Sequence, residues 1–400
     1  MEIYSELKTV KKYPLRFLLA ISLSAIAFLP ANYLLLPPPV SAQTSPASFR
    51  FIAWADTKSD TNVLKNLSVQ TKALNPVFTV YPGDLESSGF TQAGMDVWKN
   101  AVNGGFNNGM FDITFPVRGN HDNANQNPTA WQGYFNFASQ ISAIGGSNYS
   151  YLDPDLTYSF DYQNSRILGI DVPGNVTLMT SAQISWIDQR LTDAENKGLT
   201  HAFLYWHGPF YSEANHCCPL PPAELAAVFN KHPVVSATIH GHEHILTYTH
   251  INSSRDNRVT REFEQVITGD AGAGITVATS GKYDYAINLN GANVGGFVTV
   301  DVSGNSFTLT YYKGGTTAPL YTKTFTKGSI PNISNTPPPT VPPAGKPGDA
   351  NADNKVDGLD YVIWLNNYNK PAAGAGKGDF NSNGLVDGLD YVIWLNNYNK

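Results

Sequence analysis

The stretch Gly119-Asn120-His121-Asp122 lies one residue after the apolar run 113–117, which predicts a β-strand. Four other segments have the same layout, in which an apolar run ends at side chains that bind metals. They are Asp56 after residues 51–54, Gly83-Asp84 after 77–81, His207 after 202–206, and His240-Gly241-His242-Glu243-His244 after 234–239. Open α/β sheets place their chemistry just beyond the carboxyl ends of the strands. The sequence therefore predicts one site at a sheet edge.

The residue types at these strand ends indicate the chemistry of the site. Asp, Asn and His supply the oxygen and nitrogen ligands that suit Zn, Mn or Fe, and a shared carboxylate can bridge two ions. Two ions held about 3.5–4 Å apart activate a water and stabilise both oxygens of a phosphoester displacement. His242 and His244 lie two residues apart, so on an extended segment both would face the site.

Composition limits the possible functions. The chain has 400 residues, 42% of them apolar, which is enough for a large domain and a small one. It has 32 acidic and 26 basic residues and no Lys/Arg-rich run in its body, which argues against a broad nucleic-acid surface. Its two cysteines, Cys217 and Cys218, are adjacent, so they could form a vicinal disulfide, link two chains or stay reduced.

The N-terminus has the layout of a secretory signal. Basic residues between Lys8 and Arg16 precede the apolar run 17–36, and Val40-Ser41-Ala42 forms a small-residue cleavage site before Gln43. We expect residues 1–42 to be a signal peptide and the protein to be secreted, extracellular or associated with the cell surface, with no membrane span after cleavage. The alternative is a retained anchor, since a run of about 20 apolar residues can span a bilayer.

The rest of the chain divides into three parts. Residues 43–328 alternate strands with helices, including a helix that begins at Thr180 or Ser181 and ends at Gly198, and a hairpin over 296–313. Residues 329–347 are rich in proline and predict a stiff spacer. Residues 348–400 form a separate module, because 356–370 and 386–400 are the same fifteen residues.

The motifs over residues 49–325 resemble those of the calcineurin-like metallophosphoesterases, a family that includes the purple acid phosphatases. The family pattern is Asp-x-His, Gly-Asp, Gly-Asn-His-Asp/Glu, a lone His, and Gly-His-x-His, and the last four occur here in order. The resemblance implies an α/β fold of two packed mixed β-sheets flanked by helices. It also implies that a metal-bound hydroxide hydrolyses phosphate esters with two transition-metal ions (Mn, Fe or Zn).

The resemblance also implies roles for individual residues. Asp84 would bridge the two ions, Asp56 and His244 would bind the first, and Asn120, His207 and His242 would bind the second. His121 would face the substrate as a catalytic residue, protonating the leaving group or stabilising charge. Asp122 is a further catalytic candidate that would orient His121, although an aspartate capping the following turn is equally consistent with the sequence.

The chain departs from the family pattern at Lys58, which stands where the first histidine is expected. A lysine ammonium has no lone pair for a metal. Three outcomes remain open: water fills the ligand position while Lys58 binds the substrate phosphate, one ion is lost, or the site is inactive. In the last case the protein would be a non-catalytic surface or scaffold protein. His216, in the loop 213–222, is another candidate for substrate binding, and an exposed loop histidine is the alternative.

The C-terminal module contains two loops with the oxygen-ligand spacing of an EF-hand, each followed by a short helix. The predicted calcium ligands are Asp349, Asn351, Asp353, Lys355, Asp357 and Asp360, and Asp379, Asn381, Asn383, Leu385, Asp387 and Asp390. This small all-α pair resembles a type I dockerin, which implies two Ca²⁺ ions and a cohesin-like partner. In dockerins, loop positions 10 and 11 help set partner choice, and here they are Gly358-Leu359 and Gly388-Leu389. The alternative is a calcium-stabilised cap without a partner.

Overall fold

The computed structural model describes residues 48–58, 60–86, 91–122, 128–172, 177–214, 218–274, 276–287, 294–327, 346–368, 370, 374–381 and 386–399. The predicted signal peptide and nearly all of the predicted spacer lie outside these residues. None of the helices within them is both long and apolar enough to cross a membrane.

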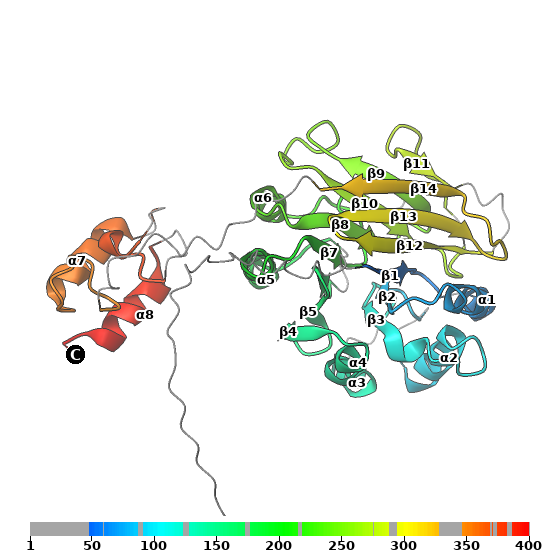
Figure 1. Cartoon of the computed structure of the whole chain (residues 1–400), viewed down its shortest axis with the longest axis horizontal. Helices are drawn as coiled ribbons and strands as arrows, with labels where there is room; N and C mark the ends of the chain where they lie inside the picture. The colour runs from blue at the N-terminus through cyan, green and yellow to red at the C-terminus, as the bar shows by residue number, and fades with distance from the viewer. Residues whose placement is uncertain are drawn as a thin grey trace, which may run out of the picture. The chain divides into compact units, whose positions relative to one another are not determined.

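Two mixed β-sheets form the main domain (Figure 1). The first has the order β14 (Tyr321–Thr326), β13 (Ser306–Lys313), β12 (Gly296–Ser303), β1 (Ser48–Ala53), β2 (Phe78–Pro82) and β3 (Thr114–Val117). The second has the order β11 (Tyr285–Ala286), β9 (Leu246–Ile251), β10 (Phe263–Thr268), β8 (Val235–His240), β7 (His201–Tyr205), β6 (Ser165–Gly169), β5 (Thr157–Tyr162) and β4 (Ser147–Asp153). Strands β1, β2 and β3 run parallel, as do β6, β7, β8 and β10.

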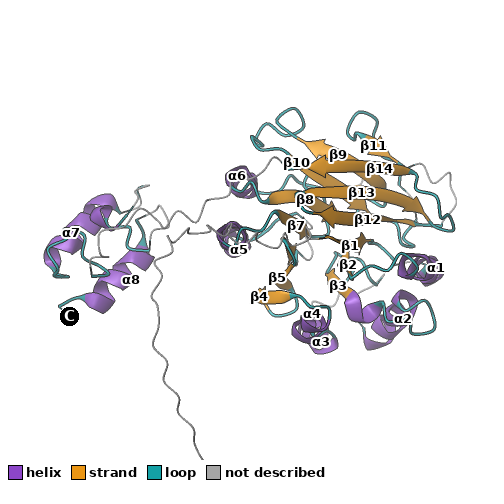
Figure 2. Cartoon of the chain, in the orientation of Figure 1, coloured by secondary structure: helices purple, strands orange, loops and turns teal. Residues whose placement is uncertain are grey.

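Helices flank both sheets (Figure 2). They are α1 (Thr61–Lys72), α2 (Gln92–Val102), α3 (Pro128–Tyr134), α4 (Phe137–Ala143), α5 (Ser181–Asn196) and α6 (Ala223–Lys231), with a short 3-10 turn, η1 (Phe111–Ile113), before β3. The expected α/β fold with two packed sheets and flanking helices is confirmed.

Aromatic side chains from both sheets fill the space between them. The ring of Phe51 on β1 lies 5.0 Å from Phe78 on β2 and 5.2 Å from Phe203 on β7, and Phe203 lies 5.4 Å from Phe307 on β13. All four side chains are buried. Buried aromatic pairs contribute both hydrophobic area and edge-to-face contacts, so this layer holds the two sheets together.

The predicted helix and hairpin are confirmed. Thr180 caps α5 with a capping box in which its side chain and that of Gln183 bond each other's backbone amides, and Gly198 follows the helix with φ of +70°. Strands β12 and β13 pair antiparallel from Gly296–Lys313 to Ser303–Ser306.

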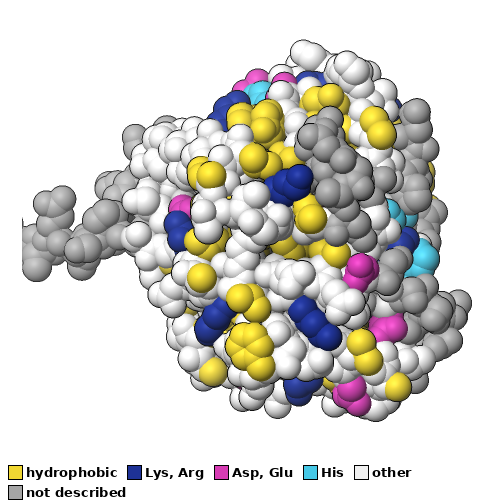
Figure 3. Space-filling model, turned by 90° about the vertical axis from the view of Figure 1, so that its right-hand side faces the viewer, with side chains coloured by type: hydrophobic (Ala, Val, Ile, Leu, Met, Phe, Trp, Pro, Cys, Tyr) yellow, Lys and Arg dark blue, Asp and Glu magenta, His cyan; other side chains and the backbone are white. Residues whose placement is uncertain are grey.

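The surface of the main domain carries no concentrated basic charge on the face drawn in Figure 3. Among the residues described there, lysine and arginine side chains are scattered singly between apolar and uncharged ones.

The C-terminal unit pairs α7 (Gly358–Asn367) with α8 (Gly388–Asn397), with a short 3-10 turn, η2 (Ala375–Lys377), between them. The indole of Trp364 donates to Asp387 O and that of Trp394 to Asp357 O, both at 2.9 Å. Each tryptophan therefore binds the helix start of the other copy, and the aromatic residues pack across the pair.

Both loops of this unit are built around an aspartate of the following helix. Asp360 accepts hydrogen bonds from the amides of Ala350, Asn351 and Asp357, and Asp390 accepts the corresponding three from Phe380, Asn381 and Asp387. Asn354, in the first loop, has a left-handed backbone with φ of +65°. Two predicted ligands of the second loop, Asn383 and Leu385, lie outside the described residues.

A buried ion pair supports the loop that follows β3. Arg118 donates to both oxygens of Asp171, at 2.9 and 2.6 Å, and the two side chains are only 7% and 8% exposed. We expect Arg118→Met to lower the free energy of unfolding by about 3–5 kcal/mol, because it leaves the Asp171 carboxylate buried without its partner. Urea unfolding measures this loss. The double variant Arg118→Met/Asp171→Leu should regain part of it, and a single variant as stable as the wild type would contradict the assignment.

Candidate metal centre

The five predicted strand-end segments meet at one edge of the main domain. Three follow β1, β2 and β3 of the first sheet, and two follow β7 and β8 of the second. Ligand atoms of Asp56, Asp84 and His207 all lie within 4.8 Å of one another, and the three side chains are buried. The carboxyl ends of parallel strands from both sheets thus bring Asp56 and His207 together, although they are 151 positions apart in the chain.

The other three predicted ligands join this group. Asn120 Oδ1 lies 3.0 Å from His207 Nε2 and 2.9 Å from His242 Nδ1, and the two imidazole nitrogens are 3.1 Å apart. His207 Nε2 also lies 3.3 Å from Asp84 Oδ1, and His244 Nε2 lies 3.8 Å from Asp56 Oδ1. The structure therefore brings all six predicted metal ligands together.

Hydrogen bonds to the backbone orient these ligands. His207 donates from Nδ1 to Pro82 O at 2.7 Å, so its Nε2 faces the cluster. The amide of His242 donates to both oxygens of Asp56, at 3.1 and 2.9 Å. The amide of His121 donates to Asp84 Oδ1 at 3.0 Å, whereas Asp84 Oδ2 is buried and has no hydrogen-bond partner among the described residues. A buried carboxylate with one such oxygen, beside the imidazole of His207, fits a divalent transition metal.

The charges of the centre depend strongly on one another. Burial raises the pKa of Asp56, while His207 acts against this effect. Burial would also raise the pKa of Asp84, but the neighbouring His207 holds it below its ordinary value. Burial lowers the pKa of His207, yet Asp84 more than reverses this and raises it to about 9. Two buried carboxylates thus require positive charge at this position, which is what a metal cation supplies.

Four of the ligands have a strained backbone. The φ angles of Asp56, Asp84, His242 and His244 are +57°, +56°, +66° and +49°. A left-handed backbone costs about 1–3 kcal/mol for a non-glycine residue and is typical of functional sites. His242 and His244 both face the centre, but the expected reason was wrong: the segment is not extended, and the two left-handed turns aim the rings instead.

Glycines allow the loops to approach the two carboxylates. A Cβ atom on Gly119 would collide with Asp84 Oδ1, and one on Gly241 would collide with Asp56 Oδ2. The glycines next to the predicted ligands are therefore needed for close packing against the carboxylates. The glycine-rich segment 269–274 also runs close by, since the amide of Ala273 donates to Asp56 O at 2.9 Å.

Lys58 and His121 lie together at the half-buried rim of the centre. Lys58 Nζ is 3.1 Å from His121 Nε2. An ammonium group can only donate, so Nε2 of His121 is the acceptor in this contact. Lys58, the residue that departs from the family pattern, is thus in direct contact with His121, the candidate catalytic histidine.

Asp122 is placed differently from what we expected of a catalytic residue. Its Oδ1 accepts from the amides of Leu85 and Glu86, both at 2.9 Å, and its Oδ2 accepts from Gly119 at 2.8 Å. Burial, with the nearby Asp84, raises the pKa of Asp122 to about 7. The carboxyl group therefore joins the loops that follow β2 and β3.

The sequence did not identify two buried glutamates behind the centre. Glu243, between the two histidines, accepts from Ser212 Oγ at 2.5 Å and from the amides of Glu213 and Ala214 at 2.8 and 3.2 Å. It thereby fastens the loop after His207 to the loop after β8. Glu213 in turn accepts from Gln265 at 2.6 Å and is fully buried. In the sequence, Glu243 stands out only because it lies between two predicted metal ligands, His242 and His244. No pattern in the sequence singles out Glu213.

The structure describes only part of the loop 213–222. His216 and Cys217 lie outside the described residues, so the structure leaves the predicted substrate contact of His216 as a prediction. Cys218 is disulfide-bonded, which agrees with the first of the three alternatives for the cysteine pair.

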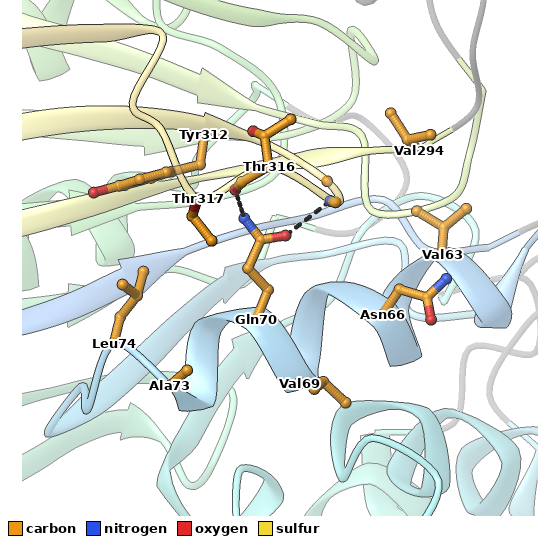
Figure 4. Close-up of a pocket in the computed structure, with 12 residues that line it drawn as sticks. Val63, Asn66, Val69, Gln70, Ala73, Leu74, Val294, Tyr312, Thr316 and Thr317 are labelled. Atoms are coloured by element: carbon orange, nitrogen blue, oxygen red, sulfur yellow. Dashed lines mark hydrogen bonds between the residues drawn. The ribbon is translucent and has the colours of Figure 1, made fainter.

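A separate cavity of about 630 Å³ lies between α1 and the turn after β13 (Figure 4). Val63, Val69 and Leu74 line it on the helix side, and Gln70 binds the turn through Thr316 O at 2.5 Å and Gly315 N at 2.9 Å. None of the candidate ligands is among the lining residues. The cavity is therefore separate from the candidate metal centre.

Residues 50–246 match the family model of the calcineurin-like phosphoesterases, so this part of the chain is similar to the domain of that family. No curated protein matches the sequence significantly.

Three solved structures are among those that match this chain. Purple acid phosphatase PPD1 from yellow lupin (Lupinus luteus) seeds is 14% identical, with a TM-score of 0.56 over 71% of this chain and 55% of that chain. GAP50, the anchor in the inner membrane complex of Plasmodium, is 15% identical (TM-score 0.45; 70% and 89% covered), and PhoD is 12% identical (TM-score 0.46; 70% and 70%). The match spans about half the length of the lupin phosphatase, and at this identity it shows a shared fold.

The buried Glu213 predicts a pH dependence of stability. Burial raises the pKa of Glu213 to about 8 from the value of 4.5 for an exposed glutamate. Between about pH 4.5 and pH 8 the folded state holds a proton that the unfolded state has lost, so stability falls as the pH rises. Urea unfolding at pH 5 and pH 9 should show a larger loss for the wild type than for Glu213→Gln.

The exposed Glu224, at the start of α6, provides the matched control. Glu224→Gln should keep the pH dependence of the wild type. Equal pH dependence of Glu213→Gln and the wild type would contradict a buried, protonated Glu213.

Proposed function

We propose that the protein is a secreted, metal-dependent phosphoesterase that hydrolyses phosphate esters and is docked to a scaffold or cell surface by its C-terminal module. One observation carries the enzymatic part: six donor side chains from five strand ends meet at one edge, where the buried Asp84 Oδ2 has no hydrogen-bond partner among the described residues. Residues 1–42 as signal peptide, 43–328 as the catalytic domain, 329–347 as spacer and 348–400 as docking module complete the proposal.

The residues divide into ligands and substrate-facing groups. Asp56, Asp84, Asn120, His207, His242 and His244 would hold the metal, which when bound supplies Lewis acidity and an activated water for attack at phosphorus. His121 lies half-buried at the rim, where its imidazole would protonate the leaving oxygen or stabilise charge on the phosphoryl group. Asp122 acts as a positioning residue through the three backbone amides that it accepts.

His121→Ala tests the catalytic part of the proposal. We expect turnover to fall on the order of 10²–10⁴-fold, because a proton-transfer group is lost, while the metal content stays unchanged. The measurement is hydrolysis of p-nitrophenyl phosphate and bis-p-nitrophenyl phosphate by the full chain with added Mn, Zn or Fe, with elemental analysis in parallel. The preferred ester distinguishes a monoesterase from a diesterase.

His250→Ala is the matched control, because His250 pairs with Glu264 on the neighbouring strand and is not one of the candidate ligands. Its turnover should equal that of the wild type. If metal content and turnover fall together in His121→Ala, His121 is structural. If the wild type hydrolyses neither ester with any metal, the catalytic proposal fails and the module would carry the function.

The docking part rests on the duplicated C-terminal unit. The two loops would bind two Ca²⁺ ions through their oxygen ligands, which is the chemistry of EF-hand loops. Leu359 and Leu389 are each 63% exposed, and Val362 and Val392 are each 48% exposed. The two helices thus present equal apolar faces, which supports a cohesin-like partner bound in either of two rotated modes.

Substituting the exposed leucines tests this arrangement. Leu359→Asp or Leu389→Asp alone should weaken calcium-dependent binding to a cohesin domain only about twofold, because one of two equivalent modes remains. The double variant should lose binding. Titration calorimetry against a panel of cohesin domains, with and without EGTA, measures the effect.

Leu220→Asp is the control, since Leu220 is 56% exposed in the main domain. It should bind like the wild type. Undiminished binding by the double variant would refute the assigned faces, and no binding to any cohesin would favour a calcium-stabilised cap.

A further inference from the structure

The donors of the metal centre fall into a compact half and an open half. In the compact half, the distances among Asn120 Oδ1, His207 Nε2 and His242 Nδ1 are 2.9–3.1 Å, and Asp84 Oδ1 lies 3.3 Å from His207 Nε2. Donors bound to one ion at roughly 2.0–2.2 Å lie about 2.8–3.1 Å apart at the edges of an octahedron and about 3.3–3.6 Å apart at the edges of a tetrahedron. Asn120, His207 and His242 are therefore already spaced for a single ion, and Asp84 lies beside His207.

The open half contains fewer donors and a cation. Asp56 Oδ1 and His244 Nε2 are 3.8 Å apart, which is wider than the edges of the compact half. Both oxygens of Asp56 already accept from the amide of His242. Lys58, two residues after Asp56, is one of the charges that act on the Asp56 carboxylate, and an ammonium group cannot act as a ligand.

The charge balance of the centre also favours one ion. The two carboxylates of the cluster, Asp56 and Asp84, are 0% and 1% exposed, so their charges are compensated locally. One divalent ion balances both, and the Lys58 ammonium then leaves one positive charge for the substrate. A second divalent ion would stand beside the ammonium in a poorly solvated site, where like charges repel strongly.

We propose that Lys58 takes the place of a second metal ion: the centre binds one divalent transition metal through Asp84, Asn120, His207 and His242, and the Lys58 ammonium binds the phosphoryl oxygens beside it. The contact of 3.1 Å with His121 Nε2 fixes the ammonium at the half-buried rim, where a phosphate can reach both groups. This inference rests on the proposed function and defines how that site binds its substrate.

Counting metal ions tests the first part. The full chain, with excess calcium to fill the C-terminal loops, is loaded with Mn, dialysed and subjected to elemental analysis. The wild type should hold about one Mn per chain, whereas Lys58→His, which removes the charge and adds a ligand, should hold about two. The electron paramagnetic resonance signal should be that of an isolated Mn in the wild type and that of a spin-coupled pair in Lys58→His.

Binding of inorganic phosphate tests the second part. Lys58→Met keeps the length of the side chain and removes its charge, so phosphate should bind about tenfold more weakly or worse. Titration calorimetry on the Mn-loaded chain measures this change. Unchanged phosphate affinity would overturn the role of the ammonium.

The outcomes separate this inference from the proposed function. Two Mn per wild-type chain would overturn the inference even if the protein hydrolyses esters. One Mn in the wild type and two in Lys58→His would support it even if no ester is hydrolysed, in which case only the catalytic proposal fails. One Mn in both proteins would also overturn it, because the missing ion would then not depend on Lys58.

Discussion

The burial of Asp56 and Asp84 side by side is the constraint on which the rest of the centre depends. Both carboxylates lie within 4.8 Å of His207 and have almost no contact with solvent. Two like charges in a medium of low dielectric constant are costly unless cations compensate them. The imidazoles, the Lys58 ammonium and a metal ion are the groups that can do this. The left-handed backbones and the glycines follow from the need to bring these groups so close together.

A second set of acidic residues, Asp122 and Glu243, connects the loops that carry the ligands. Asp122 joins the loops after β2 and β3, and Glu243 joins the loops after β7 and β8. Both use carboxylate oxygens to bind backbone amides that loops would otherwise leave unpaired. The ligands therefore stand on loops that are cross-connected within each sheet, and the aromatic layer between the sheets fixes one set against the other. Such support keeps ligand geometry within the narrow limits that metal binding needs.

In the C-terminal unit, the two copies of the duplicated sequence pack against each other and so form a shared small core. Each copy supplies a tryptophan whose indole binds the helix start of the other copy, and each aspartate at the end of a loop binds three amides of that loop. The buried area is small, so ions bound in the loops would add stability that packing alone does not provide. The same duplication leaves two equal apolar faces on the outside.

The sequence by itself determined the strand-end ligands, one helix and one hairpin, because apolar runs and short motifs are local properties, and the resemblance of its motifs to those of the metallophosphoesterases implied the two-sheet fold. Gly119-Asn120-His121-Asp122 and Gly241-His242-Glu243-His244 sufficed to predict which side chains would meet. Only the tertiary structure decided what Asp122, Glu213 and Glu243 do, since their partners come from loops that are distant in the chain. It also replaced the expected extended geometry of His242 and His244 with left-handed turns. Finally, it placed Lys58 against His121, a contact between residues 63 positions apart that no local pattern encodes.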